Sequence, residues 1–210
     1  MATVSAPAPR RRRSLRRFVF MLTAFVPGAV FASWALVQLT GWGAFWWLAP
    51  VVTFGIIPVL DLLVGSRSSD QSAATLETLE DDPLYRWATY LYLPAQYLSL
   101  IFACWLWAGG GWLAMGFIDK IGLMVTVGII GGVAINAAHE LGHKTSRAER
   151  RASKVALAQT CYGHFYVEHN RGHHKRVATV EDPATPRFGE SLYRFVPRSL
   201  VGSLRSAWAL

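Results

Sequence analysis

The sequence of 210 residues has few of the features that mark a soluble or secreted domain. It holds only two cysteines, Cys104 and Cys161, which are too few for a disulfide framework and lack the CxxC spacing of a metal-binding pair. Charged residues make up only 16% of the chain, whereas hydrophobic residues make up 52%. This balance excludes an ordinary soluble domain and indicates a membrane protein.

Long apolar runs fill much of the chain before position 139. A helix that crosses a bilayer needs about 20 mainly apolar residues, and four segments meet this requirement: 18–39, 42–64, 85–108 and 112–138. We therefore predict an all-α fold, a polytopic transmembrane helical bundle. The predicted organisation is a disordered basic tail over 1–17, four transmembrane helices within 18–138, a histidine-box region over 139–190, and the start of a further amphipathic or membrane helix over 191–210.

Positive charge is almost absent from one side of the predicted bundle. When the positive-inside rule assigns the arginine-rich tail to the cytoplasm, only Lys120 of the 21 lysines and arginines falls near the opposite face. The net charge of +8 then reflects topology and contact with anionic lipid, and no motif for nucleic-acid recognition accompanies it. This assignment predicts a multi-pass protein with its N-terminus and its histidines on the cytoplasmic side.

All six histidines lie between positions 139 and 174. His139 and His143, in HELGH, are four residues apart, so on a helix both imidazoles share one face and reach one metal ion. His169 and His173 repeat this spacing, whereas on an α-helix His174 points about 100° away and is free for a second ion. We predict that these five side chains bind two metal ions, but imidazole alone does not choose among iron, zinc, copper and nickel. Residues 147–174 hold good helix formers and no proline, which predicts continuous helix.

Three carboxylates are candidates for the surroundings of the metal. Glu140 and Glu168 are each adjacent to a predicted ligand, where a carboxylate commonly orients a metal-bound imidazole. The alternative for either is an ion pair, with Lys144, Arg171 or Lys175. Asp61, near the end of the second apolar segment, is either a third such carboxylate or an ordinary helix-end anion. His164 lies off the face of the second cluster and is interpreted as a hydrogen-bonding or interfacial residue rather than a ligand.

The residues around the histidines resemble a known family. NAAHELGHKTS and YGHFYVEHNRGHHKRVATVEDPATPRFGES are similar to the membrane-bound alkane 1-monooxygenases, which belong to the histidine-box superfamily of diiron membrane oxygenases and desaturases. The resemblance implies two non-haem iron ions on the cytoplasmic side of the bacterial inner membrane, with the five histidines as ligands: His139, His143, His169, His173 and His174. It also implies hydroxylation of medium- or long-chain n-alkanes to 1-alkanols by O2, with electrons from a rubredoxin-type donor that a rubredoxin reductase reduces.

The family carries further histidine boxes, whereas this chain has no histidine after His174. We therefore expect an N-terminal part of such an enzyme, inactive alone, that needs a C-terminal part with further histidine ligands. Alternatives are a fatty-acid or other lipid hydroxylase or desaturase of the same superfamily, a membrane scaffold or metal-handling protein, and an intramembrane zinc protease with Glu140 as general base. The second histidine cluster argues against the protease, which needs three ligands and an open site.

Overall fold

The computed structural model describes residues 21–64, 83–111 and 113–210, and all regular secondary structure within these ranges is helical. The predicted disordered tail over 1–17 lies outside the described residues, as does most of a polar connector over 65–84 for which the sequence suggests a short surface helix. The chain divides into two compact units, Met1–Gly131 and Gly132–Leu210, and the division falls within helix α7 (Phe117–His143). The all-α class is confirmed.

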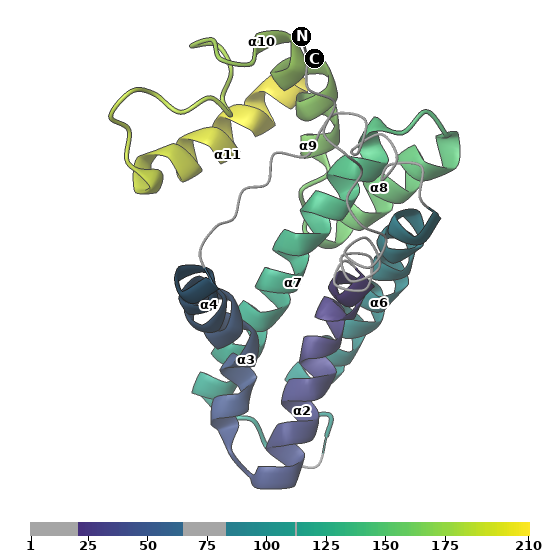
Figure 1. Ribbon diagram of the computed structural model, residues 1–210, viewed down its shortest axis with the longest axis vertical. Coiled ribbons are helices and arrows are strands. Elements are labelled where there is room, and N and C mark those ends of the chain that lie inside the picture. The colour runs from purple at the N-terminus through teal and green to yellow at the C-terminus, as the bar shows by residue number, and fades with distance from the viewer. Residues whose placement is uncertain (1–20, 65–82, 112) are drawn as a thin grey trace, which may run out of the picture. The chain divides into compact units, whose positions relative to one another are not determined.

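The first unit contains the apolar helices that the sequence predicts. Its elements before α7 are η1 (Leu22–Gly28), α2 (Ala29–Thr40), η2 (Gly43–Trp47), α3 (Leu48–Val51), η3 (Val52–Ile56), α4 (Ile57–Val64) and α6 (Pro83–Trp107) (Figure 1). Among the described residues, three helical runs are long and apolar enough to cross a membrane: Leu22–Thr40, Gly43–Val64 and Phe117–His143. Helix α6 forms where another span was predicted, but its tyrosines, its tryptophans and Gln96 lower its hydropathy and it is not among the three. The membrane span predicted over 85–108 therefore stays a prediction.

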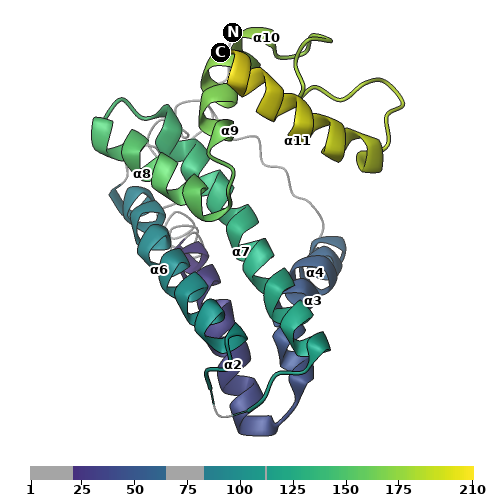
Figure 2. The same cartoon turned by 180° about the vertical axis from the view of Figure 1, so that it is seen from behind.

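Polar side chains on these apolar helices bond to backbone carbonyl groups. Figures 1 and 2 both show α2 and α6 side by side, and the Ser99 hydroxyl of α6 donates to the carbonyl oxygen of Pro27 in η1 over 2.5 Å. The Thr126 hydroxyl of α7 likewise donates to the carbonyl oxygen of Trp46 over 2.9 Å. A buried hydroxyl without a partner is costly where no water reaches it, so these bonds are what a lipid-embedded bundle requires.

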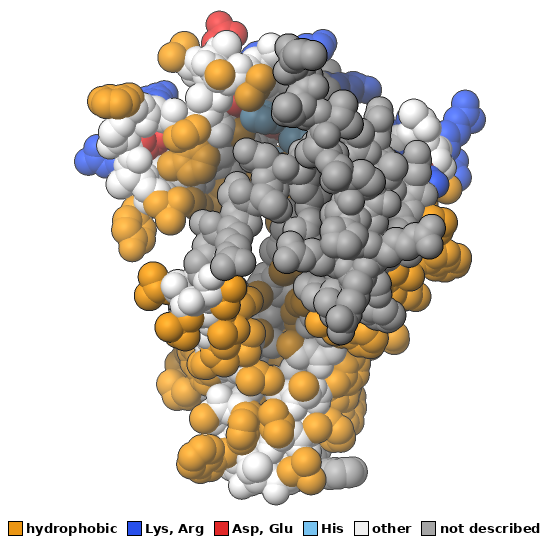
Figure 3. Space-filling model, in the orientation of Figure 1, with side chains coloured by type: hydrophobic (Ala, Val, Ile, Leu, Met, Phe, Trp, Pro, Cys, Tyr) orange, Lys and Arg blue, Asp and Glu red, His pale blue; other side chains and the backbone are white. Residues whose placement is uncertain are grey.

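The outer surface of the first unit is apolar. Hydrophobic side chains cover much of the visible face of α3 and α4 in Figure 3, and within this stretch Phe54 is 73% exposed and Leu62 is 83% exposed. None of the residues of η3 or α4 is buried. An apolar surface of this kind suits contact with lipid rather than water.

The second unit surrounds the end of α7 with α8 (Arg147–Gln159), α9 (His164–Val167), η4 (Glu168–His173), α10 (His174–Arg176) and α11 (Leu192–Ala209). Its apolar core includes Ala138 and Leu141 of α7 together with Leu157 of α8. The Ser153 hydroxyl of α8 donates to the Ala138 carbonyl oxygen over 2.6 Å, which fixes α8 against the last turns of α7. Helix α11 lies within 191–210, where the sequence predicts the start of a further helix, and it carries apolar residues on one side and arginines on another.

The continuous helix predicted over 147–174 is wrong. Helix α8 ends at Gln159, and the chain turns through Cys161, whose φ of 53° is left-handed. The Cys161 N–H donates to the Ala158 carbonyl oxygen and the Tyr162 N–H donates to that of Leu157, which is the Schellman pattern of helix termination. This position is usually a glycine, so a cysteine there gave no signal in the sequence.

Candidate metal centre

His139 and His143 occupy one face of the last turns of α7, as their spacing predicts. Their Nε2 atoms lie 3.2 Å apart. Ala138 and Leu141 of the same turns are buried, and Gly142 packs so closely that an added Cβ would lie 3.2 Å from the Ser153 hydroxyl oxygen. The packing of one face of α7 against its neighbours therefore leaves the opposite face for the two imidazoles.

The second cluster lies on a π-helical segment, and this corrects the expected direction of His174. In η4 the N–H of His174 donates to the carbonyl oxygen of His169, five residues earlier. Residues five apart then lie one above the other, and the Nε2 atoms of His169 and His174 are 3.1 Å apart. His173 stays close as well, because its ring stacks on that of His169 with a centroid separation of 5.3 Å.

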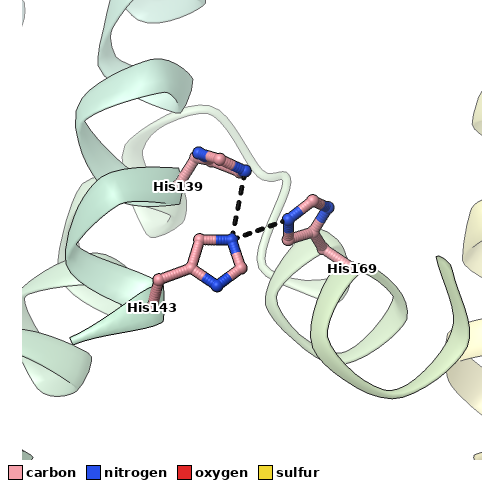
Figure 4. Close-up of side chains that lie close together, drawn as sticks. All are labelled: His139, His143 and His169. Atoms are coloured by element: carbon pink, nitrogen blue, oxygen red, sulfur yellow. Dashed lines mark hydrogen bonds between the residues drawn. The ribbon is translucent and has the colours of Figure 1, made fainter. Parts of the chain in front are cut away.

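The two clusters meet at His143 and His169, whose Nε2 atoms are 3.0 Å apart (Figure 4). Coordinating nitrogens of His139, His143 and His169 all lie within 4.8 Å of one another. Two nitrogens that each lie about 2.1 Å from one ion are about 3.0 Å apart at a right angle and about 3.4 Å apart at a tetrahedral angle. The observed distances of 3.0 to 3.2 Å match neighbouring ligands of one ion, so this donor set fits a metal.

The electrostatics of the cluster favour neutral imidazoles. Burial, as the largest cause, and the nearby His139, His174, His143 and His173 together lower the pKa of His169 from its ordinary value of 6.5 to about 4. A neutral imidazole keeps a lone pair for a metal, whereas a protonated one does not. At neutral pH His169 is therefore ready to bind.

His164 takes a different position, and its buried Nε2 atom has no hydrogen-bond partner among the described residues, so the hydrogen-bonding role expected from the sequence stays a prediction. Its ring contacts that of Tyr162, with a centroid separation of 4.5 Å. Burial lowers the pKa of His164 as well. Within the described part of the chain, it is not one of the histidines whose Nε2 atoms converge.

Asp182 was not predicted from the sequence, and it is the carboxylate that lies nearest to one of the predicted ligands, His173. The His173 Nδ1 atom lies 2.9 Å from Asp182 Oδ2, and the Asp182 side chain is fully buried. Burial opposes ionisation of Asp182, but hydrogen bonds from Thr185, Ala184 and His173 outweigh it and hold its pKa below the ordinary value. The signal in the sequence was an acid followed by proline eight residues after the second box, which alone points to no metal.

The three predicted carboxylates differ in their surroundings. Glu140 Oε1 lies 3.4 Å from His139 Nδ1, with its side chain 65% exposed. Glu168 is buried, and it is paired with Arg176 at 3.1 Å rather than with any of the three cations considered from the sequence. Asp61 belongs to α4 in the first unit, so its part in the metal surroundings stays a prediction.

A cavity of about 620 Å³ lies beside the histidines in the second unit. His143 forms part of its wall, and the described residues that line it include no acidic side chain. The cationic side chains of the lining are Lys144, Arg150, Lys154 and Arg171. The space next to the cluster is therefore positively charged and attracts anionic groups.

Comparison with known proteins shows which proteins this chain is similar to. The chain is 39% identical over 195 residues to an alkane 1-monooxygenase of Pseudomonas putida, covering 93% of this chain and 48% of that relative. It is 44% identical over 158 residues to an alkane 1-monooxygenase of Acinetobacter baylyi, covering 75% of this chain and 38% of that relative. The chain is homologous to the alkane 1-monooxygenases.

Residues 111–210, which hold all six histidines, match the fatty acid desaturase family. An alkane 1-monooxygenase of Alcanivorax borkumensis is 36% identical over 198 residues, covering 93% of this chain and 48% of that relative. This chain spans about half the length of the curated relatives from Pseudomonas and Alcanivorax. The resemblance to alkane 1-monooxygenases expected from the histidine boxes is confirmed.

Proposed function

We propose that the whole protein is a non-haem diiron membrane monooxygenase that inserts one oxygen atom of O2 into a terminal C–H bond of medium- or long-chain n-alkanes. The observation that carries the proposal is the convergence of imidazole nitrogens from His139, His143 and His169 at the end of an apolar helix. The relatives are alkane 1-monooxygenases, and this supports the reaction. The spacing of the nitrogens supports the metal.

In this proposal, bound iron supplies the redox chemistry that activates dioxygen. The residues of the chain hold and orient it: His139 and His143 from α7, and His169, His173 and His174 from the π-helical segment and the start of α10. The apolar length of α7 gives the substrate its route, because each methylene that leaves water gains roughly 0.8 kcal/mol and an alkane therefore concentrates in the bilayer. The site then receives alkane from the lipid, and it receives electrons from a donor protein in the aqueous phase.

Two iron ions need more donors than five imidazoles provide. We therefore place further ligands in the part of the full-length protein that this sequence does not span, and we expect the 210 residues alone to be inactive. An iron assay that finds two tightly bound ions for each isolated chain would contradict this part of the proposal.

The basic cavity beside His143 supports an acidic electron donor of the rubredoxin type, itself reduced by a rubredoxin reductase. With the four predicted spans, the positive-inside rule would put the N-terminal arginines and the histidines on the same, cytoplasmic side of the inner membrane, where such a donor is found. A positive docking region predicts that turnover falls as ionic strength rises, because salt screens exposed charges beyond about 8 to 10 Å.

The test uses the full-length protein in lipid nanodiscs with iron, a rubredoxin, its reductase and octane, and it measures 1-octanol. We expect His139→Gln to abolish the product and to lower bound iron. His164→Gln is the matched control, and we expect it to keep both. Equal iron and equal product in His139→Gln and the unmodified protein would refute the assignment.

A second candidate is a lipid hydroxylase or desaturase, because residues 111–210 match the fatty acid desaturase family. A parallel assay with an acyl substrate separates the two, since an alkane enzyme forms more product from octane. An intramembrane zinc protease, in contrast, would contain zinc and would lose proteolysis in Glu140→Ala while it keeps its metal.

A further inference from the structure

We propose that Asp182 is a positioning residue that holds His173 with a proton on Nδ1 and with Nε2 free to bind metal. The proposal rests on the proposed function, because it takes His173 as a ligand. It adds a residue that lies nine positions after that histidine and belongs to no histidine box. Its basis is the network of hydrogen bonds to the buried carboxylate of Asp182.

Three donors converge on the two oxygens of Asp182. The Thr185 hydroxyl donates to Oδ2 over 2.5 Å, and the backbone N–H of Ala184 donates to Oδ1 over 3.0 Å. His173 Nδ1 lies 2.9 Å from Oδ2. The Asp182 side chain has no exposed surface, so water does not replace any of these partners.

The arrangement fixes which ring nitrogen of His173 carries the proton. An ionised carboxylate only accepts hydrogen bonds, so the Nδ1 atom beside it must donate. A neutral imidazole then has its lone pair on Nε2, and Nε2 is also the nitrogen through which His139, His143, His169 and His174 approach one another. Asp182 therefore sets both the tautomer and the direction of the His173 ring.

The backbone around Asp182 is shaped to hold this network. Ala178 has a left-handed φ of 65°, a conformation that costs a residue with a Cβ about 1 kcal/mol. Its N–H donates to the Thr185 hydroxyl oxygen over 3.0 Å. Because Thr185 accepts there, its own hydrogen is free to point at Asp182. The strained residue, the threonine and the carboxylate thus form one chain of bonds that ends at His173.

The test compares iron binding by full-length variants, with Asp182→Asn as the main change. Asparagine has nearly the same shape but a single acceptor oxygen, so it cannot accept from all three donors. Loss of such a bond to a metal ligand typically lowers metal affinity about 10- to 100-fold, and we expect this range together with one fewer imidazole nitrogen in the iron X-ray absorption spectrum. Glu181→Gln, at the exposed acid next to it, is the matched control and should bind iron as the unmodified protein does.

A second pair of variants covers the case in which Asp182→Asn does not fold. Thr185→Val removes the hydroxyl that holds the carboxylate and should weaken iron binding, whereas Thr185→Ser keeps the hydroxyl and should restore it. Equal affinity in Thr185→Val and Thr185→Ser, or an unchanged spectrum in a folded Asp182→Asn, overturns the proposal. Failure of the unmodified protein to bind iron would instead reject the proposed function, so the two failures are distinguishable.

Discussion

Replacing Gly172 by alanine should disrupt the second histidine cluster, although alanine is the better helix former. Gly172 lies between Glu168 and Arg176, four residues from each, and these two side chains meet across it at 3.1 Å. A Cβ on residue 172 would lie 2.5 Å from Arg176 Nη2 and 2.5 Å from the carboxyl carbon of Glu168. Both groups must move to admit a methyl group.

The expected cost follows from two opposing effects. Forced movement in a packed site costs about 1 to 3 kcal/mol, and alanine restores about 0.4 to 1 kcal/mol by restricting the unfolded chain. The net loss ranges from about 0 to 2.6 kcal/mol and is centred on about 1.3 kcal/mol, and this central value lowers the Tm of a chain of this size by roughly 3 to 5 °C. A larger loss, up to about 5 kcal/mol, would mean that Glu168 is left buried without its cation.

The assay is thermal unfolding of the purified protein, with Gly163→Ala as the matched control. Gly163 has helical angles, and no atom lies within 4 Å of a Cβ built on it. We expect its free energy of unfolding to stay within about 0.5 kcal/mol of that of the unmodified protein, which is a change in Tm of at most about 2 °C. Removing the Glu168 side chain together with Gly172→Ala should recover part of the loss as a coupling energy. Equal Tm values for Gly172→Ala and Gly163→Ala would refute the reasoning.

Three further predictions concern the same unit. Without metal, the Tm should fall as pH drops from 6.5 to about 4, because the unfolded chain protonates His169 in this range and the folded chain does not. The variant His169→Gln should show a weaker dependence of Tm on pH. Ala178→Gly should keep iron binding and raise Tm slightly, since glycine adopts the left-handed conformation without strain; a fall in Tm would show that no strain is stored there. Arg198→Lys should lower Tm, because Arg198 donates to both carboxylate oxygens of Glu190 at 2.6 Å and one ammonium cannot match that fork; an unchanged Tm would reject a role for the pair.

The parts of the site that follow from regular α-helix geometry could be predicted from the sequence. The shared face of His139 and His143 is fixed by their spacing of four residues, and the structure keeps it. The apolar runs likewise required helices near the observed bounds, because in lipid only a helix satisfies all its backbone hydrogen bonds within one segment. Where one local rule decides the structure, residue types alone were sufficient.

The remaining features depend on choices between backbone conformations that the residue types do not signal. Cys161 takes the left-handed position that ends α8, where glycine is usual. The π-helical segment places the side chain of His174 next to that of His169, whereas an α-helix over the same residues would point the two side chains in different directions. Asp182 reaches His173 only because the chain turns back between them. Each of these is decided by tertiary contacts.

These departures from local rules gather around the histidines. The π-helical segment contains His169 and His173, and Gly172 within it is the residue whose missing side chain lets Glu168 and Arg176 pair. The left-handed Ala178 supports Thr185 and through it the carboxylate at His173. Strain and irregular helix persist only where other contacts overdetermine them, and such places are commonly functional. The second histidine cluster is therefore built for the direction of its side chains at a cost in local stability, as a preorganised metal centre requires.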